Sequence, residues 1–415
     1  MNLIKTSFYT SISQGLSILG GLISVKVVSA QIGPEGMAMT GQFFNTSAVF
    51  ALFATGALGV AVVKYLAQFT NNKPMQLRII RTAVFIMLGC SFLVGLIVVF
   101  SSAYLSFYAF KTDKYQGVYI YWGCFIVIFT MSNLFASILN GLKLIKYLTI
   151  VNVIGTAVGV SFTILMAHFF GVKGVLISSN FTALVLFCLH IYFLNKYKWF
   201  SFTELFGKLD IEVVRLFSAF ILMTVVSGIL SPAIQLFVRN KIIADFSFVE
   251  AGYWQSLTRI SDYYLGFVTS VLAVYYLPKL SEISDRNELR AEIKQGYKII
   301  LPVVGILSFS IWICRYWIIN LLLTKEFLPS ADLYAFQFLG DFFKIASWLI
   351  AYLMLAKSLK ITFIISEILA SIVYVLLTYF FINRFGLIGS VYGFCSTYFL
   401  YLIAMFIIMK KQRII

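Results

Sequence analysis

Charged side chains are scarce in this sequence. Asp, Glu, Lys and Arg make up 12% of the 415 residues, whereas soluble domains contain about 25%. Long hydrophilic segments are also missing, because the largest gaps between apolar runs, near 195–215 and 278–298, are short. These gaps leave no place for a soluble catalytic domain. With 61% hydrophobic residues, the chain is predicted to be an all-α polytopic membrane protein.

Residue groups that mark common catalytic chemistry are missing as well. The chain has no GxxxxGK[ST] phosphate-binding loop, which argues against ATP hydrolysis. The five cysteines form no CxxC pair, and His168 and His190 stand alone without metal-ligand spacing. We therefore expect no metal site, no cofactor and no catalytic residue, and we predict a transporter rather than an enzyme.

The apolar runs define about twelve spans. They cover roughly 8–31, 41–64, 83–104, 118–140, 148–169, 174–194, 216–238, 253–277, 299–323, 333–356, 361–382 and 388–409. Basic residues such as Arg78, Arg81, Arg286 and Lys410 gather on one side, whereas few, including Arg239, fall in loops on the other. The positive-inside rule then places both termini in the cytoplasm. Because the net charge of +16 is spread over these loops, we expect no nucleic-acid partner.

The two halves of the chain repeat one another. FGVKG at 170–174 matches FGLIG at 385–389, and Tyr65 and Leu66 match Tyr276 and Leu277. Since six spans fall in each half, both halves enter the membrane in the same orientation. We predict two parallel six-helix lobes, residues 1–200 and 201–415, around a central polar cavity.

The span at 253–277 carries charges at bilayer depth. Gln255, Arg259, Asp262 and Gly266 fall on one stripe of a helix. An ionised side chain at that depth costs about 2.5–3.5 kcal/mol unless it faces protein or water. This stripe is predicted to line a polar cavity.

The span at 333–356 repeats the arrangement with Gln337, Asp341 and Lys344. Each of the two helices sets an acid and a base three residues apart, near enough for an intrahelical ion pair. Either these pairs only neutralise themselves and fix helix packing, or they line the cavity. We favour the cavity, because small residues and hydroxyls achieve packing at lower cost.

These charges do not recur in the first half. Ala48 and Ala51 stand where the second half has Arg259 and Asp262. What the two halves share is the scaffold, and what they do not share is expected to form the site.

Three further charged residues have open roles. Lys26 lies in the outer third of the first span, where it either extends to the outer interface or faces the cavity. Arg315, between Trp312 and Trp317, is expected to anchor a helix at the interface. Glu367 is either a proton site or a partner for a lysine of an inner loop.

Fixed cations in a membrane cavity suit an anionic cargo. Arg and Lys side chains bind phosphate and pyrophosphate groups. Trp254, Tyr263, Tyr264 and Phe338 lie beside the charged stripes and offer flat apolar faces on which sugar rings could pack.

Several stretches resemble one known family over nearly the whole chain. They are IGPEG at 32–36, KYLAQFTNN at 64–72, WQSLTRISDYYLGF at 254–267, YYLPKLSE at 275–282, KEFLPSADLYAFQFLGDFFK at 325–344 and LAKSLK at 355–360. Together with twelve spans in two halves, they resemble the Wzx-type polysaccharide flippases of the multidrug/oligosaccharidyl-lipid/polysaccharide exporter superfamily. Within this family, which includes the O-antigen flippases, the resemblance is greatest to the branch that contains the enterobacterial common antigen flippase, chiefly through the WQ-ISD-Y and GD-x-x-K stretches.

The resemblance implies transfer of an undecaprenyl-pyrophosphate-linked oligosaccharide from the cytoplasmic to the periplasmic leaflet of a Gram-negative inner membrane. Arg259 and Lys344 would bind the pyrophosphate or acidic sugars with help from Lys26, and Asp262 and Asp341 would hold these cations. Coupling to a proton or sodium gradient would need a carboxylate, for which Asp262, Asp341 and Glu367 are candidates. Membrane lipid, a polysaccharide polymerase and a chain-length regulator are the candidate partners.

Two other functions compete with this one. A cation-coupled drug exporter on the same scaffold would need a net acidic cavity, which the mixed, slightly basic set of charges disfavours. A membrane-embedded glycan polymerase would need a large periplasmic loop with catalytic Arg or His residues, and the outer loops are short.

Overall fold

The computed structural model describes residues 3–196, 202–205, 207–283, 285–357 and 359–411, and every regular element in these ranges is helical. Its contacts divide the chain into two compact units. Unit 1 consists of Met1–Ile32 and Met39–Ala233, and unit 2 of Gly33–Ala38 and Ile234–Ile415. The halves 1–200 and 201–415 were defined by the sequence repeat rather than by contacts, and they stay a prediction.

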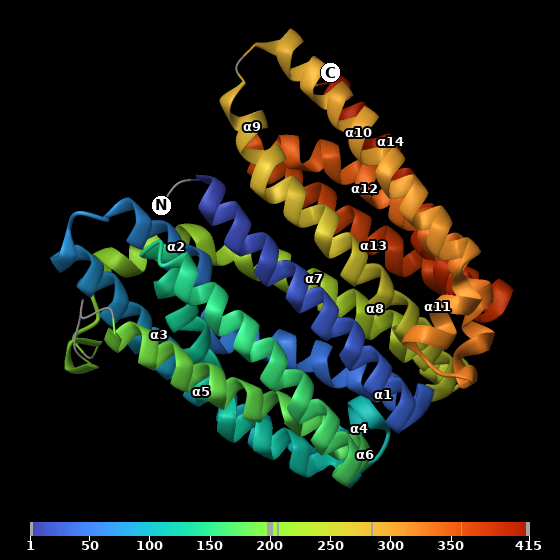
Figure 1. The fold of residues 1–415 in the computed structure, drawn as a ribbon, viewed down its shortest axis with the longest axis horizontal. Coiled ribbons are helices and arrows are strands. Elements are labelled where there is room, and N and C mark those ends of the chain that lie inside the picture. Colours follow the sequence, from blue (N-terminus) through green and yellow to red (C-terminus); the bar gives the residue numbers. More distant parts are fainter. Residues whose placement is uncertain (1–2, 197–201, 206, 284, 358, 412–415) are drawn as a thin grey trace. The chain divides into compact units, whose positions relative to one another are not determined.

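Unit 1 contains the N-terminal helices, except for the short stretch Gly33–Ala38 of the first one (Figure 1). They are α1 (Leu3–Ala54), α2 (Gly59–Gln68), α3 (Lys73–Phe100), α4 (Ser102–Phe110), α5 (Gln116–Gly141) and α6 (Ile145–Lys196), with short 3-10 turns η1 (Asp113–Tyr115) and η2 (Phe202–Leu205). Helix α5 packs against α2, α3 and α6. The next helix, α7 (Ile211–Asp245), begins in unit 1 and ends in unit 2.

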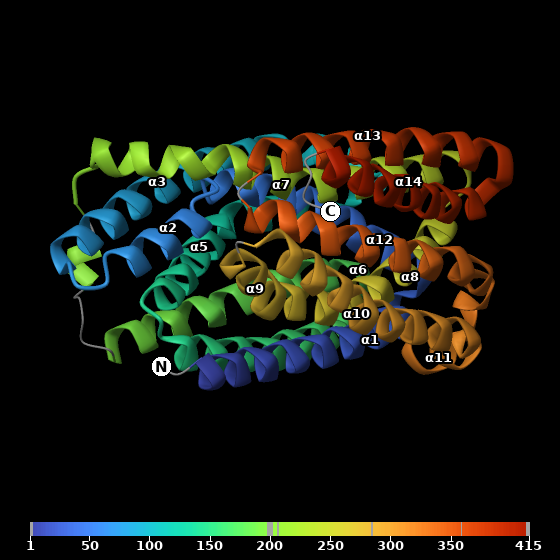
Figure 2. The same cartoon turned by 90° about the horizontal axis from the view of Figure 1, so that it is seen from above.

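Unit 2 contains the remaining helices. They are α8 (Phe248–Val271), a π-helical turn η3 (Leu272–Tyr276), α9 (Leu277–Glu282), α10 (Arg286–Ile313), α11 (Arg315–Leu322), the 3-10 segment η4 (Lys325–Leu333), α12 (Tyr334–Ala356), α13 (Lys360–Phe385), the turn η5 (Gly386–Ile388) and α14 (Gly389–Lys411). Helix α12 is central, because it packs against α8, α10 and α14, while α13 lies alongside α14 (Figure 2).

Eight helices in the described residues are long and apolar enough to cross a membrane, by length and composition. Three of them contain two expected spans each, joined near Gly33, Gly171 and Gly386. Helix α8, which carries Arg259 and Asp262, is not one of the eight. The chain is thus an all-α polytopic membrane protein.

The glycine motif repeated in the sequence forms the same bend twice. Gly171 (φ 56°, ψ −134°) interrupts α6, and Gly386 (φ 70°, ψ −150°) ends α13. Such positive φ values are natural for glycine and strained for other residues. At the second glycine of each motif the backbone is very close: a Cβ on Gly174 would lie 1.9 Å from the Met166 carbonyl oxygen, and one on Gly389 would lie 2.2 Å from that of Phe381.

Some expected spans are interrupted. The span expected at 41–64 breaks after Ala54, where Gly56 (φ 56°) and Ala57 (φ 53°) adopt left-handed backbone, and it resumes as α2. The span expected at 299–323 is divided at Cys314 into α10 and α11. Uniformly apolar composition hides such breaks, because hydropathy does not report backbone angles.

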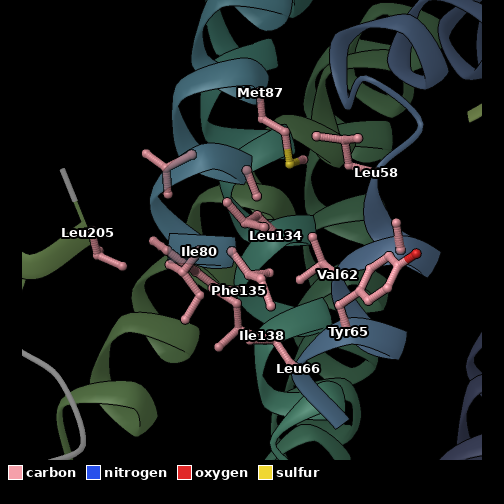
Figure 3. Close-up of a cluster of buried hydrophobic side chains, with 14 of the residues drawn as sticks. Leu58, Val62, Tyr65, Leu66, Ile80, Met87, Leu134, Phe135, Ile138 and Leu205 are labelled. Atoms are coloured by element: carbon pink, nitrogen blue, oxygen red, sulfur yellow. The ribbon is translucent and has the colours of Figure 1, made fainter. Parts of the chain in front are cut away.

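The core of unit 1 forms where α2, α3 and α5 meet (Figure 3). Leu66 from α2, Ile80 from α3 and Ile138 from α5 are fully buried. The Tyr65 hydroxyl donates to the Leu216 carbonyl at 3.2 Å, which ties the start of α7 to this cluster.

The outer faces of the helices are apolar. Phe100 is 84% exposed and Ile361 is 75% exposed. Large apolar side chains in such numbers are unfavourable in water, whereas lipid solvates them. This distribution fits helices whose outer faces meet the bilayer.

Candidate functional site

Asp341 is a buried acidic group of unit 2 with several hydrogen-bond donors. Its side chain on α12 is fully buried. The Ser261 and Tyr264 hydroxyls of α8 donate to Oδ2 at 2.6 and 2.8 Å, and Gln337 Nε2 donates to Oδ1 at 3.4 Å. Hydroxyl donors can satisfy the oxygens of a buried carboxyl group in either protonation state.

The spacing of Asp341 and Lys344 would allow an ion pair within α12, but the two side chains contact other groups. In the described structure Asp341 and Lys344 form no ion pair, and Ser261, Tyr264 and Gln337 occupy the carboxyl oxygens instead. The physical reason is that α8 packs against α12 and brings hydroxyl groups closer than the lysine, which points to the neighbouring rings.

Lys344 lies among three aromatic rings, which we call the Lys344 cage. Its Nζ is 5.0 Å from the ring centre of Trp348, 5.5 Å from that of Tyr398 and 5.8 Å from that of Phe394. Cation–π attraction is worth about 0.5–2 kcal/mol per contact, more when water is excluded. The Lys344 charge also acts on the carboxyl groups of Asp341 and Glu367, so these three groups form one electrostatic cluster.

Glu367 has a partner that the sequence did not suggest. The Tyr401 hydroxyl of α14 donates to its Oε1 at 2.6 Å, and Ser366 Oγ lies 3.4 Å from that same hydroxyl. The described contacts of Glu367 thus join α13 to α14 and do not include a lysine of an inner loop.

Arg239 is a buried cation that sequence reasoning missed. We expected it in an outer loop, and this expectation is wrong, because α7 continues to Asp245 and buries Arg239 completely. Its guanidinium donates to Gln255 Oε1 and lies 5.4 Å from the ring centre of Trp254. Apolar Ile242 and Ile243, which follow at helical spacing, were the signal that could have revealed the longer helix.

The remaining stripe residues of α8 have different environments. Arg259 is half-buried and near enough for its charge to act on Arg239. Asp262 is exposed, and its charge acts on Asp341. Gln255 is buried and engaged by Arg239. Three of the predicted residues on α8 therefore share one region of unit 2 with Asp341 and Arg239.

Lys26 and Arg315 lie on other helices, α1 and α11. Lys26 is half-buried on α1 in unit 1. Arg315 begins α11, donates to the Trp312 carbonyl at 2.9 Å, and lies 4.6 Å from the ring centre of Tyr316. Aromatic packing at a helix start fits the interfacial anchor proposed for Arg315.

Ion pairs occur at the ends of two helices. Arg78 of α3 binds Asp210 and Glu212 next to the start of α7, and Lys241 binds Asp245 at 2.8 Å. The Arg78 guanidinium lowers the pKa of Asp210, chiefly through the hydrogen bond between them. Within the described residues, no group of three or more His, Cys, Asp or Glu side chains could hold a metal ion.

The chain has full-length relatives of known name. It is 27% identical over 401 residues to the lipid III flippase of Escherichia coli (strain K12), covering 97% of this chain and 96% of the relative. The lipid III flippase of Shigella flexneri matches to the same extent. No protein-family model matches the chain.

Solved structures share the fold. An inward-facing multidrug resistance transporter of the MATE family and the MOP superfamily aligns with a TM-score of 0.79 at 16% identity, covering 99% of this chain and 98% of the other. The lipid II flippase MurJ aligns with a TM-score of 0.76 at 16% identity, covering 98% and 87%. The chain therefore has the fold common to these transporters.

Proposed function

We propose that this protein is a flippase that moves an undecaprenyl-pyrophosphate-linked oligosaccharide of the O-antigen or enterobacterial common antigen type from the cytoplasmic to the periplasmic leaflet. The observation that carries the proposal is the full-length likeness to lipid III flippases. It is supported by cations and carboxyl groups held on helices α8, α12 and α13 of unit 2, where an anionic lipid head could bind.

Arg259 and Lys344 bind the pyrophosphate or acidic sugars in this proposal. Lys344 is fixed by its cage, and Arg259 is half-buried beside the engaged Arg239. Asp262 and Asp341 balance these charges, Gln255 and Gln337 orient their neighbours, and Lys26 assists from unit 1. A membrane lipid tail remains in the bilayer while the head crosses.

Coupling to a proton or sodium gradient is part of the proposal. Asp341 supports it best, because the Ser261 and Tyr264 hydroxyls place two further oxygen atoms at its carboxyl group, and hard cations prefer oxygen ligands. Asp262 and Glu367 are the other candidates. Asp341→Asn should make transport insensitive to collapse of the gradient, and an unchanged response would remove Asp341 from coupling.

The site of action is the Gram-negative inner membrane, with both termini in the cytoplasm and no catalytic residue. A polysaccharide polymerase and a chain-length regulator are the proposed neighbours. Reporter fusions to each terminus would test the orientation, since a periplasmic terminus activates alkaline phosphatase and a cytoplasmic one does not.

Complementation tests the function directly. In a strain that lacks its own oligosaccharide flippase, the wild-type chain should restore surface polysaccharide, whereas Arg259→Ala should not, at equal protein levels in the membrane. Arg286→Ala is the matched control, because Arg286 is an exposed basic residue in the same unit. Full activity of Arg259→Ala would exclude Arg259 from substrate binding.

A drug exporter is the second candidate, and the likeness to MATE structures favours it. It predicts that expression protects cells from ethidium and leaves surface polysaccharide unchanged. Restored polysaccharide without ethidium resistance would reject it.

A further inference from the structure

Unit 1 holds a cavity of about 600 Å³ that the roles above do not use. Segments of α1, α5 and α6 line it. Its wall consists mainly of small residues, hydroxyl and amide side chains and four residues of the Phe and Trp type, together with Val160, Leu186 and His190, and no Asp, Glu, Lys or Arg is among its described lining residues. The volume lies in the range of about 300–1,000 Å³ typical of small-molecule sites.

Three polar atoms on lining residues have no hydrogen-bond partner among the residues that the structure describes. They are Ser47 Oγ, Asn180 Nδ2 and His190 Nε2. These residues are 7%, 6% and 3% exposed. A buried polar atom without a hydrogen bond is unfavourable by about 1–3 kcal/mol, so a bound molecule with hydroxyl or amide groups would stabilise this wall.

The hydroxyls of the wall offer mainly acceptors. Thr156 Oγ1 donates to the Asn152 carbonyl at 2.9 Å, Ser178 Oγ to that of Val175 at 2.7 Å, and Thr182 Oγ1 to that of Ser178 at 3.1 Å. Because each hydroxyl uses its hydrogen within its own helix, its lone pairs remain for a ligand. The Asn180 amide supplies a donor, so the wall mixes donors with acceptors.

Aromatic rings complete the wall. Phe43, Phe44, Trp122 and Phe129 line the same cavity, and Phe43 packs edge-to-face on Trp122 with ring centres 6.5 Å apart. Rings beside mixed donors and acceptors suit a molecule with an apolar C–H face and a hydroxyl-bearing edge, as a pyranose has. The uncharged wall excludes ion pairing with a pyrophosphate or an organic cation.

We infer that the unit 1 cavity binds uncharged sugar residues of the lipid-linked oligosaccharide. The biological role of the site rests on the proposed function, whereas its affinity for neutral sugars does not. Ala48 and Ala51, which stand where unit 2 carries Arg259 and Asp262, line this cavity. The position that is charged in one repeat is thus uncharged in the other. In this inference unit 2 binds the charged part of the substrate and unit 1 binds its neutral sugars.

The test uses the full chain in lipid nanodiscs, since maltoside detergents carry a competing disaccharide. The probes are chitobiose, lactose and maltose as neutral disaccharides, undecaprenyl pyrophosphate as the charged head without sugar, and ethidium as a cation. We expect at least one disaccharide to bind wild type. Asn180→Leu and the smaller change Ser47→Ala each remove one hydrogen bond, so each should weaken disaccharide binding about fivefold. Asn140→Leu, an exposed residue at the end of α5, is the matched control and should bind normally.

Each outcome decides a different claim. Three results would overturn the sugar site. The first is that no disaccharide binds, and the second is that Asn180→Leu and Ser47→Ala bind a disaccharide as well as wild type does. The third is that ethidium binds in the absence of sugar and that Asn180→Leu removes this binding. Undecaprenyl pyrophosphate should bind Asn180→Leu normally and Lys344→Gln weakly. Failure of that arm alone would count against the proposed function and leave the sugar site intact.

Discussion

Tyr264→Phe provides a sharp test of how Asp341 is held. The change removes only the hydroxyl that donates to Asp341 Oδ2 at 2.8 Å, with Ser308 Oγ also 3.3 Å from it. The ring remains, and its packing on Phe338 at 5.7 Å between centres is expected to persist. Any loss of stability therefore reports the hydrogen bonds of the hydroxyl.

The size of the loss depends on the charge of Asp341. Hydrogen bonds between neutral groups in membrane helix bundles contribute about 0.6 kcal/mol on average and about 1.7 at most. Those to an ionised group contribute about 1.5–3 kcal/mol. If Asp341 is ionised, Tyr264→Phe should lower the free energy of unfolding by about 2 kcal/mol, and by clearly less in an Asp341→Asn background.

Reversible unfolding in mixed micelles with increasing dodecyl sulfate measures these values as a double-mutant cycle. Tyr263→Phe is the control, because this neighbour on α8 is half-buried and its hydroxyl has no hydrogen bond to the described residues. A loss below about 0.5 kcal/mol would refute the view that α8 fixes this carboxyl group, and the same loss in the wild-type and Asp341→Asn backgrounds would refute an ionised Asp341.

Three further predictions follow from the geometry. Lys344→Gln should abolish surface polysaccharide in complementation while Lys344→Arg retains part of it, since a guanidinium also binds aromatic rings. Gly171→Ala should lower the yield of folded protein, because left-handed backbone costs about 1–2 kcal/mol for alanine. The control Gly89→Ala, with open space at its Cβ, should not lower the yield. Size-exclusion profiles of the two variants measure the difference. Gln255→Met should lower the thermal midpoint more than Arg239→Met, because it leaves the buried Arg239 guanidinium without the oxygen that accepts from it, whereas Arg239→Met leaves only a neutral amide oxygen unpaired.

The bends at Gly171 and Gly386 could be predicted from the sequence. The recurring FGxxG motif at 170–174 and 385–389 is a local signal, and local signals determine local backbone angles. The long apolar runs likewise identified the helices, because backbone groups in lipid must bond within their own segment. The left-handed Ala57 had no such signal, since nothing in an alanine side chain marks a positive φ.

The hydrogen-bond partners of Asp341 could not be predicted from the sequence. A single-helix pattern places Arg259 and Asp262 on one stripe, yet Ser261 and Tyr264 on the same helix are the residues that contact Asp341. Which face of α8 meets α12 depends on the rotation of two packed helices. That rotation is a long-range property, so periodicity along one helix does not contain it.

Arg239 shows a different failure. The hydropathy of the sequence falls at Arg239, so a span defined by apolar composition ends at residue 238. The helix in fact continues to Asp245, because Gln255 and Trp254 solvate the guanidinium inside the protein. A charged residue within an apolar run is therefore better explained by a partner elsewhere than by a loop.

The repeat has kept its bends and changed its chemistry. Both halves retain the FGxxG bend, whereas the chemistry differs: unit 1 lines its cavity with alanines, hydroxyls and amides, and unit 2 carries Asp341, Lys344, Arg239 and Glu367 on its helices. Two identical charged units would favour a doubly anionic ligand and two uncharged ones a neutral ligand. A substrate that joins a pyrophosphate to a neutral glycan needs one of each, so exchanging Ala48 and Ala51 for Arg and Asp should abolish polysaccharide transfer without restoring any activity to an Arg259→Ala protein.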